Sequence, residues 1–303
     1  MQNTAVLYSF IEPVARKHFG LGAKSKEAQF SKIVTPDSTT EPIREFQEDA
    51  GPTILSLKTE NSAMATRNIQ PGAQRRVQVA TYAAAMEFSR EILDDIRDSE
   101  NAVQLRKVTT AAGAMGRASR LTPEYLWAQF MERTFNAAYP VTVDNVNLCS
   151  ASHVSPLGTT YSNILATPAA FSETSLEDVK TQLRTTLGSD GLLTPVMFEQ
   201  AIVPSALANI AEKIAGTRQA IGSANNEINV SYKLKYSVFD YLTNQTRWWA
   251  QTDADNGFYW NWRQKPVFER DDVANTMQAI FICFMRAMWG AEDPRCVIGV
   301  DAT

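Results

Sequence analysis

The chain has 303 residues, 44% of them hydrophobic, which suffices for one large domain or two modest ones with a sizeable core. Its formal net charge of −4 excludes the overall positive field that marks many nucleic-acid-binding proteins. Three cysteines are too few for a disulfide framework and indicate reduced thiols. The apolar runs at 5–11 and 279–285 fit neither a signal peptide nor a membrane span, so we expect a soluble protein made in a cytoplasm, without a membrane partner.

The first eighty residues divide into a helix and a long polar segment. Residues 6–19 predict a short amphipathic helix, whereas residues 20–79 are rich in Gly, Pro, Ser, Thr, Asn and Gln. Two extended pieces at 43–46 and 53–57 flank an acidic turn at 47–52 and predict a long hairpin. So polar a segment cannot order by itself, because it has little to bury. It is either a linker or an arm that becomes ordered against a neighbouring chain.

Residues 88–136 predict a long helical strut that organises the rest of the chain. Small and apolar side chains recur at steps of three and four on one face: Leu105, Val108, Ala112, Met115, Ser119, Thr122 and Leu126. The opposite face carries Arg106, Lys107, Arg117, Arg120 and Glu124 and is expected to be partly wet. Pro123 has no amide hydrogen to donate to the carbonyl of Ser119, so we predict a bend or break near Leu121. Gly113 and Gly116 predict close helix packing.

Helical and extended patterns alternate after the strut. We expect a strand at 141–146, a loop at 149–163, a helix at 176–187 preceded by residues 172–175 (SETS), a strand at 196–203 and a helix at 205–215. Tyr232, Leu234, Tyr236 and Val238 alternate with polar residues and predict a half-buried strand. Phe258, Trp260 and Trp262 share one face of a further strand, and residues 279–288 read as a buried strand or a helix segment. The fold class is therefore α+β.

Candidate catalytic residues are scarce. Cys149 and His153 are four residues apart and could form a nucleophile–base pair, but they lie in a predicted loop, and a structural histidine is favoured. The acidic residues Asp94, Asp95, Asp98 and Glu100 are interpreted as solvated ion-pair partners on a helix. Neither a phosphate-binding glycine motif nor a zinc-ligand pattern occurs in the sequence. We therefore expect no cofactor, no metal and no enzymatic activity.

Four stretches between residues 88 and 230 follow one another in a recognisable order. They are 88–95 (FSREILDD), 148–158 (LCSASHVSPLG) with 161–165 (YSNIL), 201–207 (AIVPSAL) and 225–230 (NNEINV). In this order and spacing they resemble the major capsid proteins of tailed phages with the HK97 fold, and most closely the Mu-like major head subunit family. The resemblance covers about half of the chain.

The resemblance implies an HK97-like architecture with five parts. An N-terminal arm would occupy residues 1–25, and an extended hairpin, the E-loop, residues 26–80. A peripheral P-domain with the long spine helix would span 81–140, and an axial A-domain 141–255. Residues 256–303 would form C-terminal strands that return to the P-domain. A break at Pro123 would depart from the family pattern, in which the spine is one helix.

The same resemblance implies a major head protein that assembles as pentamers and hexamers into an icosahedral shell around double-stranded DNA. The DNA would touch the inner face without sequence specificity, and portal, scaffolding and decoration proteins are further expected partners. The protein would be assembled in the host cytoplasm and end in the virion. An encapsulin-like compartment shell shares the fold and remains an alternative, as does, more remotely, a hydrolase using Cys149 and His153.

Charged residues of the polar segment are the expected contacts between subunits. They are Arg44, Glu45, Glu48, Arg75 and Arg76. Contacts of this heterologous kind, repeated around a ring, can close a shell from many weak interfaces. Charge reversal at Arg75 and Arg76 is therefore expected to impair particle formation and to leave the folding of the subunit intact.

Overall fold

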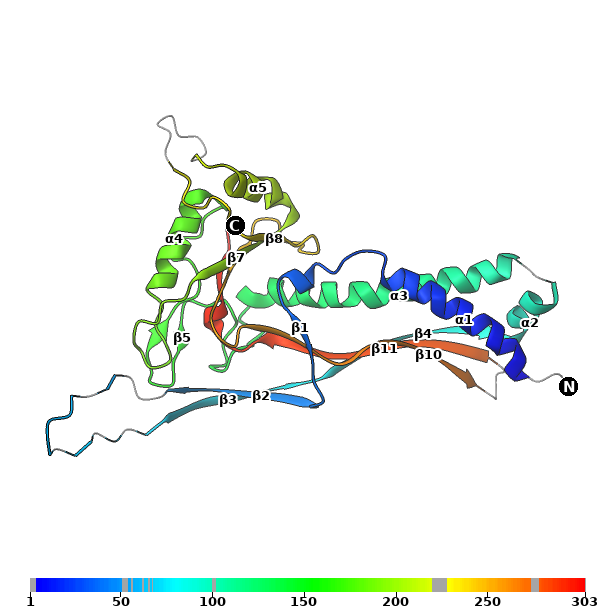
Figure 1. Cartoon of the computed structure of the whole chain (residues 1–303), viewed down its shortest axis with the longest axis horizontal. Helices are drawn as coiled ribbons and strands as arrows, with labels where there is room; N and C mark the ends of the chain where they lie inside the picture. Colours follow the sequence, from blue (N-terminus) through cyan, green and yellow to red (C-terminus); the bar gives the residue numbers. More distant parts are fainter. Residues whose placement is uncertain are drawn as a thin grey trace.

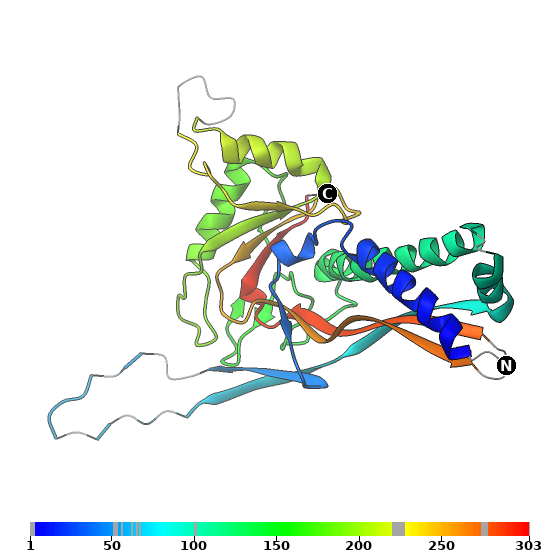
Figure 2. The same ribbon diagram turned by 45° about the vertical axis from the view of Figure 1, so that its right-hand side comes forward.

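The computed structural model describes residues 4–50, 54–55, 57–61, 63–64, 66, 68–99, 102–219, 228–273 and 278–302. An elongated sheet lies beneath long helices, and a second sheet with two shorter helices forms a lobe at one end (Figure 1). A two-stranded hairpin projects past that lobe and away from the rest of the body (Figures 1 and 2). The α+β class predicted from the sequence is confirmed.

The elongated sheet has the strand order β1-β10-β11-β4. Its strands are β1 (Pro36–Ser38), β10 (Phe258–Val273), β11 (Gln278–Ala291) and β4 (Ala80–Ser89). β11 is antiparallel to both of its neighbours, and β1 runs parallel to β10. Along β11 buried and half-buried residues alternate, as a strand with one face on the core requires. The strand interpretation of residues 279–288 is thus confirmed.

Three helices cover one face of this sheet: α1 (Thr4–Ala23), α2 (Arg90–Ser99) and α3 (Ala102–Glu132). Phe19 of α1 stacks on Phe268 of β10 at 4.8 Å, and Phe268 stacks on Phe281 of β11 at 5.5 Å. The helix predicted at 6–19 is therefore confirmed, and it packs on its own chain. An N-terminal arm that orders only against a neighbouring chain is not what the structure contains.

The helical strut differs from the prediction in two respects. Phe88 and Ser89 end strand β4, so the helical part begins only at Arg90 and is divided into α2 and α3. The predicted break near Leu121 is wrong, since α3 continues through Pro123 to Glu132. One missing hydrogen bond is tolerated there because tertiary contacts hold the helix on both sides of the proline. The indole of Trp127, for example, is fully buried.

The first part of the polar segment at 20–79 is held to the body by a few apolar side chains, although the segment as a whole is polar. Phe30, in the short helix η1 (Phe30–Lys32), is buried together with Ile33 and Val34 in the central core. The ring of Phe30 lies 4.9 Å from that of Trp260, which in turn lies 5.2 Å from Trp262. Residues 28–38 therefore belong to the body of the subunit, and the predicted boundary of the hairpin segment at residue 26 comes too early.

The hairpin pairs β2 (Ile43–Ala50) with β3 (Gln70–Gln78). The strand predicted at 53–57 is wrong in the part that is described, because Ile54, Leu55 and Leu57 are in no strand; residues 51–53 and 56 lie outside the described residues. Residues 47–50, predicted as a turn, continue β2. The second strand escaped prediction because Pro71 and Gly72 are poor strand formers, and its partner β2 supplies the order.

The lobe contains the sheet β12-β9-β7-β8 and two helices. Its elements are α4 (Glu173–Arg184), β7 (Phe198–Val203), η3 (Ser205–Leu207), α5 (Ala208–Gly216), β8 (Tyr236–Val238), β9 (Trp248–Thr252), η4 (Pro294–Cys296) and β12 (Val297–Val300). The helix predicted at 176–187 is confirmed as α4, although it begins at Glu173, and Ser172 and Ser175 form a reciprocal cap at its start. Because β12 pairs with β9, the last strand joins the lobe and does not return to the elongated sheet.

Two further strand predictions in the lobe are wrong in part or whole. Residues 141–146 form a turn closed by the Val141 amide and the Val146 carbonyl, with Asn145 at a positive φ of 59°. Only Tyr236–Val238 of the predicted 232–238 strand is extended as β8, since Lys233 has a φ of 62°. The predicted loop contains a small ladder, β5 (His153–Val154) with β6 (Thr160–Tyr161), and η2 (Arg133–Phe135) follows α3.

Candidate functional site

The projecting hairpin carries apolar side chains that no described part of the chain covers. Leu55 is 93% exposed and Leu57 94% exposed, and Ile54, Met64 and Ile69 are exposed as well. Single exposed apolar residues are ordinary, but a group of them at the far end of an extended hairpin indicates a surface that contacts another molecule. Figures 1 and 2 both place this end well away from the body.

The base of the hairpin is fastened to the body by two arginine–carboxylate pairs. Arg44 Nε on β2 pairs with Glu292 Oε1, and its guanidinium lies 4.5 Å from the ring centre of Tyr259. Arg295 Nη1 lies 2.9 Å from Glu48 Oε1, and the Arg295 side chain is only 6% exposed. Burial raises the pKa of the Glu48 carboxyl, and the attraction of Arg295 opposes that rise. Two of the five predicted interface residues therefore bind inside their own subunit.

Arg75 on the second strand makes a third attachment. Its Nη2 donates to the Pro140 carbonyl at 2.7 Å, and its Nη1 donates to the Thr142 carbonyl at 3.3 Å. Both acceptors belong to the loop that follows α3. A hairpin strand that a guanidinium joins to backbone carbonyls is held at a defined angle to the body, because the fork of Arg donors is planar and rigid.

The remaining two predicted residues face solvent. Arg76 Nε lies 2.8 Å from Glu45 Oε1 across the hairpin, and their side chains are 64% and 44% exposed. The structure thus separates the five predicted residues into an attachment set, Arg44, Glu48 and Arg75, and an exposed pair. Glu292 and Arg295, the partners in the body, were missed because nothing local in the sequence connects them to residues more than two hundred positions earlier.

Cys149 and His153 are not a nucleophile–base pair. His153 is fully buried, with Nδ1 2.8 Å from Asp144 Oδ2 and Nε2 facing the Leu148 carbonyl and Asn163 Oδ1. Burial opposes ionisation of Asp144, but hydrogen bonds from His153 and Thr142 outweigh it and lower the pKa of that carboxyl. The histidine therefore holds a loop together, which is the structural role favoured from the sequence.

The thiol of Cys149 is buried, and desolvation raises its pKa to about 12. The thiolate form that alkylating reagents attack is therefore scarce at pH 8. Iodoacetamide at pH 8 is expected to leave Cys149 unmodified in the native protein and to label it once the chain is unfolded in denaturant, as read by mass spectrometry. Native labelling at the rate of an ordinary exposed thiol would contradict this burial and revive the hydrolase alternative.

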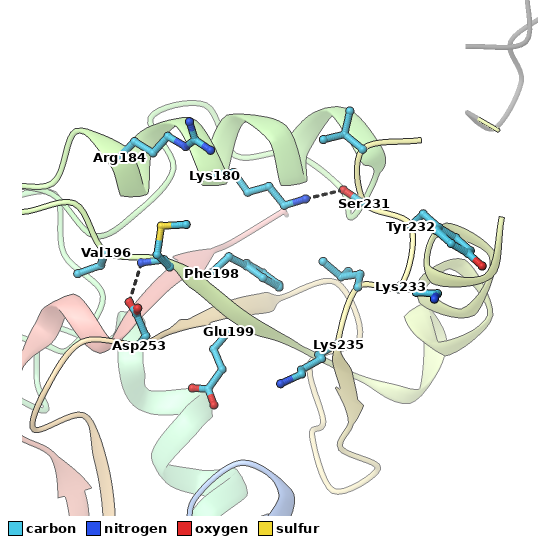
Figure 3. Close-up of a pocket in the computed structure, with 13 residues that line it drawn as sticks. Lys180, Arg184, Val196, Phe198, Glu199, Ser231, Tyr232, Lys233, Lys235 and Asp253 are labelled. Atoms are coloured by element: carbon cyan, nitrogen blue, oxygen red, sulfur yellow. Dashed lines mark hydrogen bonds between the residues drawn. The ribbon is translucent and has the colours of Figure 1, made fainter. Parts of the chain in front are cut away.

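A groove of about 520 Å³ lies between α4 and the chain at 230–235, beside β7 (Figure 3). Lys180 Nζ donates to Ser231 Oγ at 2.9 Å across it, and desolvation lowers the pKa of Lys180. Asp253 Oδ1 accepts the amide of Met197 at 2.6 Å. Its described lining residues include neither histidine nor cysteine, so the groove has a basic rim but no catalytic pair.

The described residues contain neither a metal cluster nor a membrane-spanning helix. In that part of the chain no three His, Cys, Asp or Glu side chains gather as a metal site would require. Among the helices described, none is both long enough and apolar enough to cross a bilayer. Asp94 of the predicted acidic cluster pairs with Arg90 at 3.5 Å, while Glu100 and the side chain of Asp98 lie outside the described part.

Comparison with known proteins agrees with this geometry. Residues 72–300 match the family model described as phage capsid protein. The fold is similar to the capsid of the cyanophage P-SCSP1u (TM-score 0.55, 13% identity, 92% of this chain and 89% of that one). It is also similar to the procapsid of bacteriophage JBD30 (TM-score 0.51, 12% identity, 98% of this chain and 75% of that one). The capsid of a native GTA particle is similar too (TM-score 0.54, 11% identity, 90% of this chain and 89% of that one). Among curated proteins, none matches the sequence.

The similar structures show that the chain has an HK97-like fold. The family match covers well over half of the chain, and the chain therefore belongs to the phage capsid protein family. That membership favours a phage shell over the encapsulin-like alternative. Of the stretches that carry the resemblance in sequence, residues 225–227 lie outside the described residues.

Proposed function

We propose that this protein is the major head subunit of a tailed phage, which closes an icosahedral shell of pentamers and hexamers around double-stranded DNA. The observation that carries the proposal is the hairpin with exposed Leu55 and Leu57, held out from the body by Arg44, Glu48 and Arg75. Burying those side chains on an adjoining copy would stabilise the contact between subunits by about 25 cal/mol for each Å² of apolar surface removed from water. The Mu-like head subunits, similar at 148–165 and 201–207, are the subfamily we favour.

The parts of the subunit are assigned on the same basis. The hairpin β2–β3 with the residues between its strands serves as the E-loop, and the elongated sheet with α3 as the P-domain. The lobe around β7 and β9 serves as the A-domain. Portal, scaffolding and decoration proteins are further proposed partners; the capsid of bacteriophage JBD30 has been solved decorated with minor capsid protein trimers. Catalysis plays no part in this role.

Expression of the chain alone, followed by size-exclusion chromatography and electron microscopy of the largest species, tests the proposal. Closed shells built from five- and six-membered rings are the expected result. A single compact monomer that persists at high protein concentration, with or without a co-expressed scaffolding protein, would contradict it. Shells that contain a cargo enzyme, and that never take up DNA in infected cells, would favour the encapsulin-like alternative.

The exposed pair Glu45 and Arg76 provides a sharper test of the proposed interface. The variant Arg76→Glu is expected to lower the yield of particles by several-fold. The reversed charge at position 76 would then repel the group on the neighbouring subunit that Arg76 is proposed to contact. Its free energy of unfolding should change by less than about 1 kcal/mol, as is usual for an exposed ion pair. Yield is measured by sedimentation, and stability by denaturant titration of the free subunit.

The charge-swapped variant, Glu45→Arg with Arg76→Glu, is the control for this test. It restores the ion pair within the hairpin but reverses the pattern that a neighbour meets. If the two residues contact a neighbour, the swap leaves the yield low. A swap that returns the yield to the wild-type value would show that the pair acts only within its own hairpin.

A further inference from the structure

The surface formed by α1 and α3 is basic although the chain as a whole is acidic, while the neighbouring helix α2 carries the exposed carboxylates of Glu91 and Asp95. Seven exposed cations project from α1, α3 and the residues just after α1: Arg16, Lys17, Lys24, Lys26, Arg106, Lys107 and Arg117. Only two carboxylates, Glu12 and Glu27, accompany them among the described residues of 11–27 and 103–120. With a net charge of −4 on the whole chain, such a concentration of positive charge on one face is unexpected.

Most of these cations have no carboxylate partner in the described part of the chain. Arg16 pairs with Glu12 at 2.9 Å, but no ion pair within the described residues engages the other six. Arg120 differs, since its side chain is 10% exposed and it lies 3.8 Å from the buried Glu124. Six such cations on one face repel one another, and a bound polyanion would relieve that repulsion.

The two helices also form a polar groove at the centre of this face. Its volume is about 330 Å³, and it is lined by His18, Leu21, Gly22, Ser25, Thr109, Thr110, Gly113 and Arg117. Gly22 lets the two helix backbones approach closely, because a Cβ there would lie 2.2 Å from the carbonyl oxygen of Gly113. The hydroxyl of Ser25 and the guanidinium of Arg117 supply hydrogen-bond donors of the kind that bind phosphate oxygens.

We propose that this face, formed by α1 and α3, binds the phosphate backbone of duplex DNA without sequence specificity. The inference rests on the proposed function, and it identifies the side of the subunit that faces the packaged DNA. Arg106 and Arg117 are eleven residues apart on α3, which corresponds to about 16 Å along the helix, or roughly half of a ~34 Å duplex turn. Both figures show α1 and α3 on the same side of the elongated sheet (Figures 1 and 2).

The chemistry of the face favours backbone contact over base recognition. Phe19 is the sole aromatic residue within 11–24 and 103–120, and it is buried in the core. Proteins that grip single strands usually stack the bases on several exposed aromatic rings, whereas among the described side chains of α1 and α3 only Tyr125 exposes its ring, eight residues beyond Arg117 and against Tyr241. Lysine and arginine without aromatic partners are typical of contacts that position a duplex without reading it.

The test compares two triple variants that each remove three exposed positive charges, two lysines and one arginine. The first is Lys17→Gln, Lys107→Gln and Arg117→Gln on the helical face. The matched control is Arg184→Gln, Lys213→Gln and Lys235→Gln on the lobe, where Arg184 and Lys235 line the groove of Figure 3 and Lys213 lies on α5. Fluorescence anisotropy measures binding of a labelled duplex of about 30 base pairs, roughly three turns, to the free subunit at several salt concentrations.

The helical-face triple is expected to bind at least about tenfold more weakly at low salt, with a salt slope that is shallower by about 0.9 for each phosphate that the variant no longer neutralises. The control should change affinity less than about twofold, and circular dichroism should show both variants folded. Equal weakening in the two triples, or none in either, would overturn the inference. Electron microscopy of the same preparations reports shell formation separately, so absence of shells from the wild-type chain would count against the proposed function only.

Discussion

Replacing Gly116 with alanine is expected to destabilise the subunit by about 1–3 kcal/mol, the usual range for overpacking a tight site. A Cβ at this position would lie 2.1 Å from the carbonyl oxygen of Phe19 and 2.9 Å from the amide nitrogen of Ala23, both backbone atoms of α1. Neither can rotate away as a side chain could, so α1 must move off α3. Because Phe19 stacks on Phe268, that movement also opens the core. Denaturant unfolding of the free subunit measures the change.

Gly113 is the matched control, three residues earlier in the same helix. A Cβ there would meet only the His18 carbonyl oxygen at 3.7 Å and the Arg117 guanidinium at 3.8 Å, both ordinary van der Waals contacts. Gly113→Ala should therefore be neutral or stabilise the subunit by up to about 1 kcal/mol, the helix propensity gained by replacing glycine. If both alanine variants stabilise equally, the close crossing of α1 and α3 at Gly116 is disproved.

The variant Glu124→Ala is expected to destabilise the subunit by about 3 kcal/mol or more. The Glu124 carboxylate is fully buried, and its two oxygens accept the amides of Gln29 at 2.7 Å and Phe30 at 2.9 Å. Removing it leaves two amide hydrogens without their acceptor, each costing about 1–3 kcal/mol. It also frees the segment that carries Phe30 into the central core. The free energy of unfolding at pH 7 is the measurement.

Glu124→Gln retains one acceptor oxygen and should lose roughly half as much stability. The pH dependence of the stability difference between wild type and Glu124→Gln reports on the ionisation of the Glu124 carboxyl. Burial raises the pKa of the Glu124 carboxyl, and the amides of Gln29 and Phe30 and the charge of Arg120 oppose that rise. The folded state thus holds its proton more tightly than the unfolded state, so this contribution is full below about pH 4.5 and is lost as the pH rises through the folded pKa.

Wild-type protein is therefore expected to gain stability relative to Glu124→Gln as the pH falls from 7 towards 4.5, because glutamine does not titrate. Parallel denaturant titrations of the two proteins across this range provide the measurement, and the difference between them cancels the contributions of the other carboxylates. A difference that is constant with pH would show that the Glu124 pKa is unchanged by folding.

Local patterns predicted those elements whose signals lie within a few residues. The apolar face of Leu176, Val179 and Leu183 was enough to predict α4, and all three side chains are buried. The amphipathic pattern of α1 was readable for the same reason, and the apolar run at 279–288 indicated the buried strand β11 or a helix segment. Strand pairing could not be predicted from local patterns. β3 owes its strand conformation to its partner β2, and the angle of the hairpin to the body depends on the loop that Arg75 contacts.

The candidate site shows the same division. The sequence singled out five charged residues of the polar segment as expected contacts between subunits, yet could not show that Arg44, Glu48 and Arg75 attach to their own subunit. Their partners lie 65 to 248 residues away along the chain. Conversely, the resemblance to capsid proteins was available from soft motifs alone, because their order along the chain survives where individual residues differ.

By itself the sequence determined the α+β class, the helical spine, the absence of a local catalytic motif and the likeness to phage heads. Each of these follows from periodicity, capping or motif order, which involve neighbours in the chain. Only the tertiary structure decided that the spine continues through Pro123, that the amino-terminal helix rests on its own subunit, and that α1 and α3 lie on the same side of the elongated sheet. Those outcomes depend on packing between distant segments, whose energies exceed the local preferences they override.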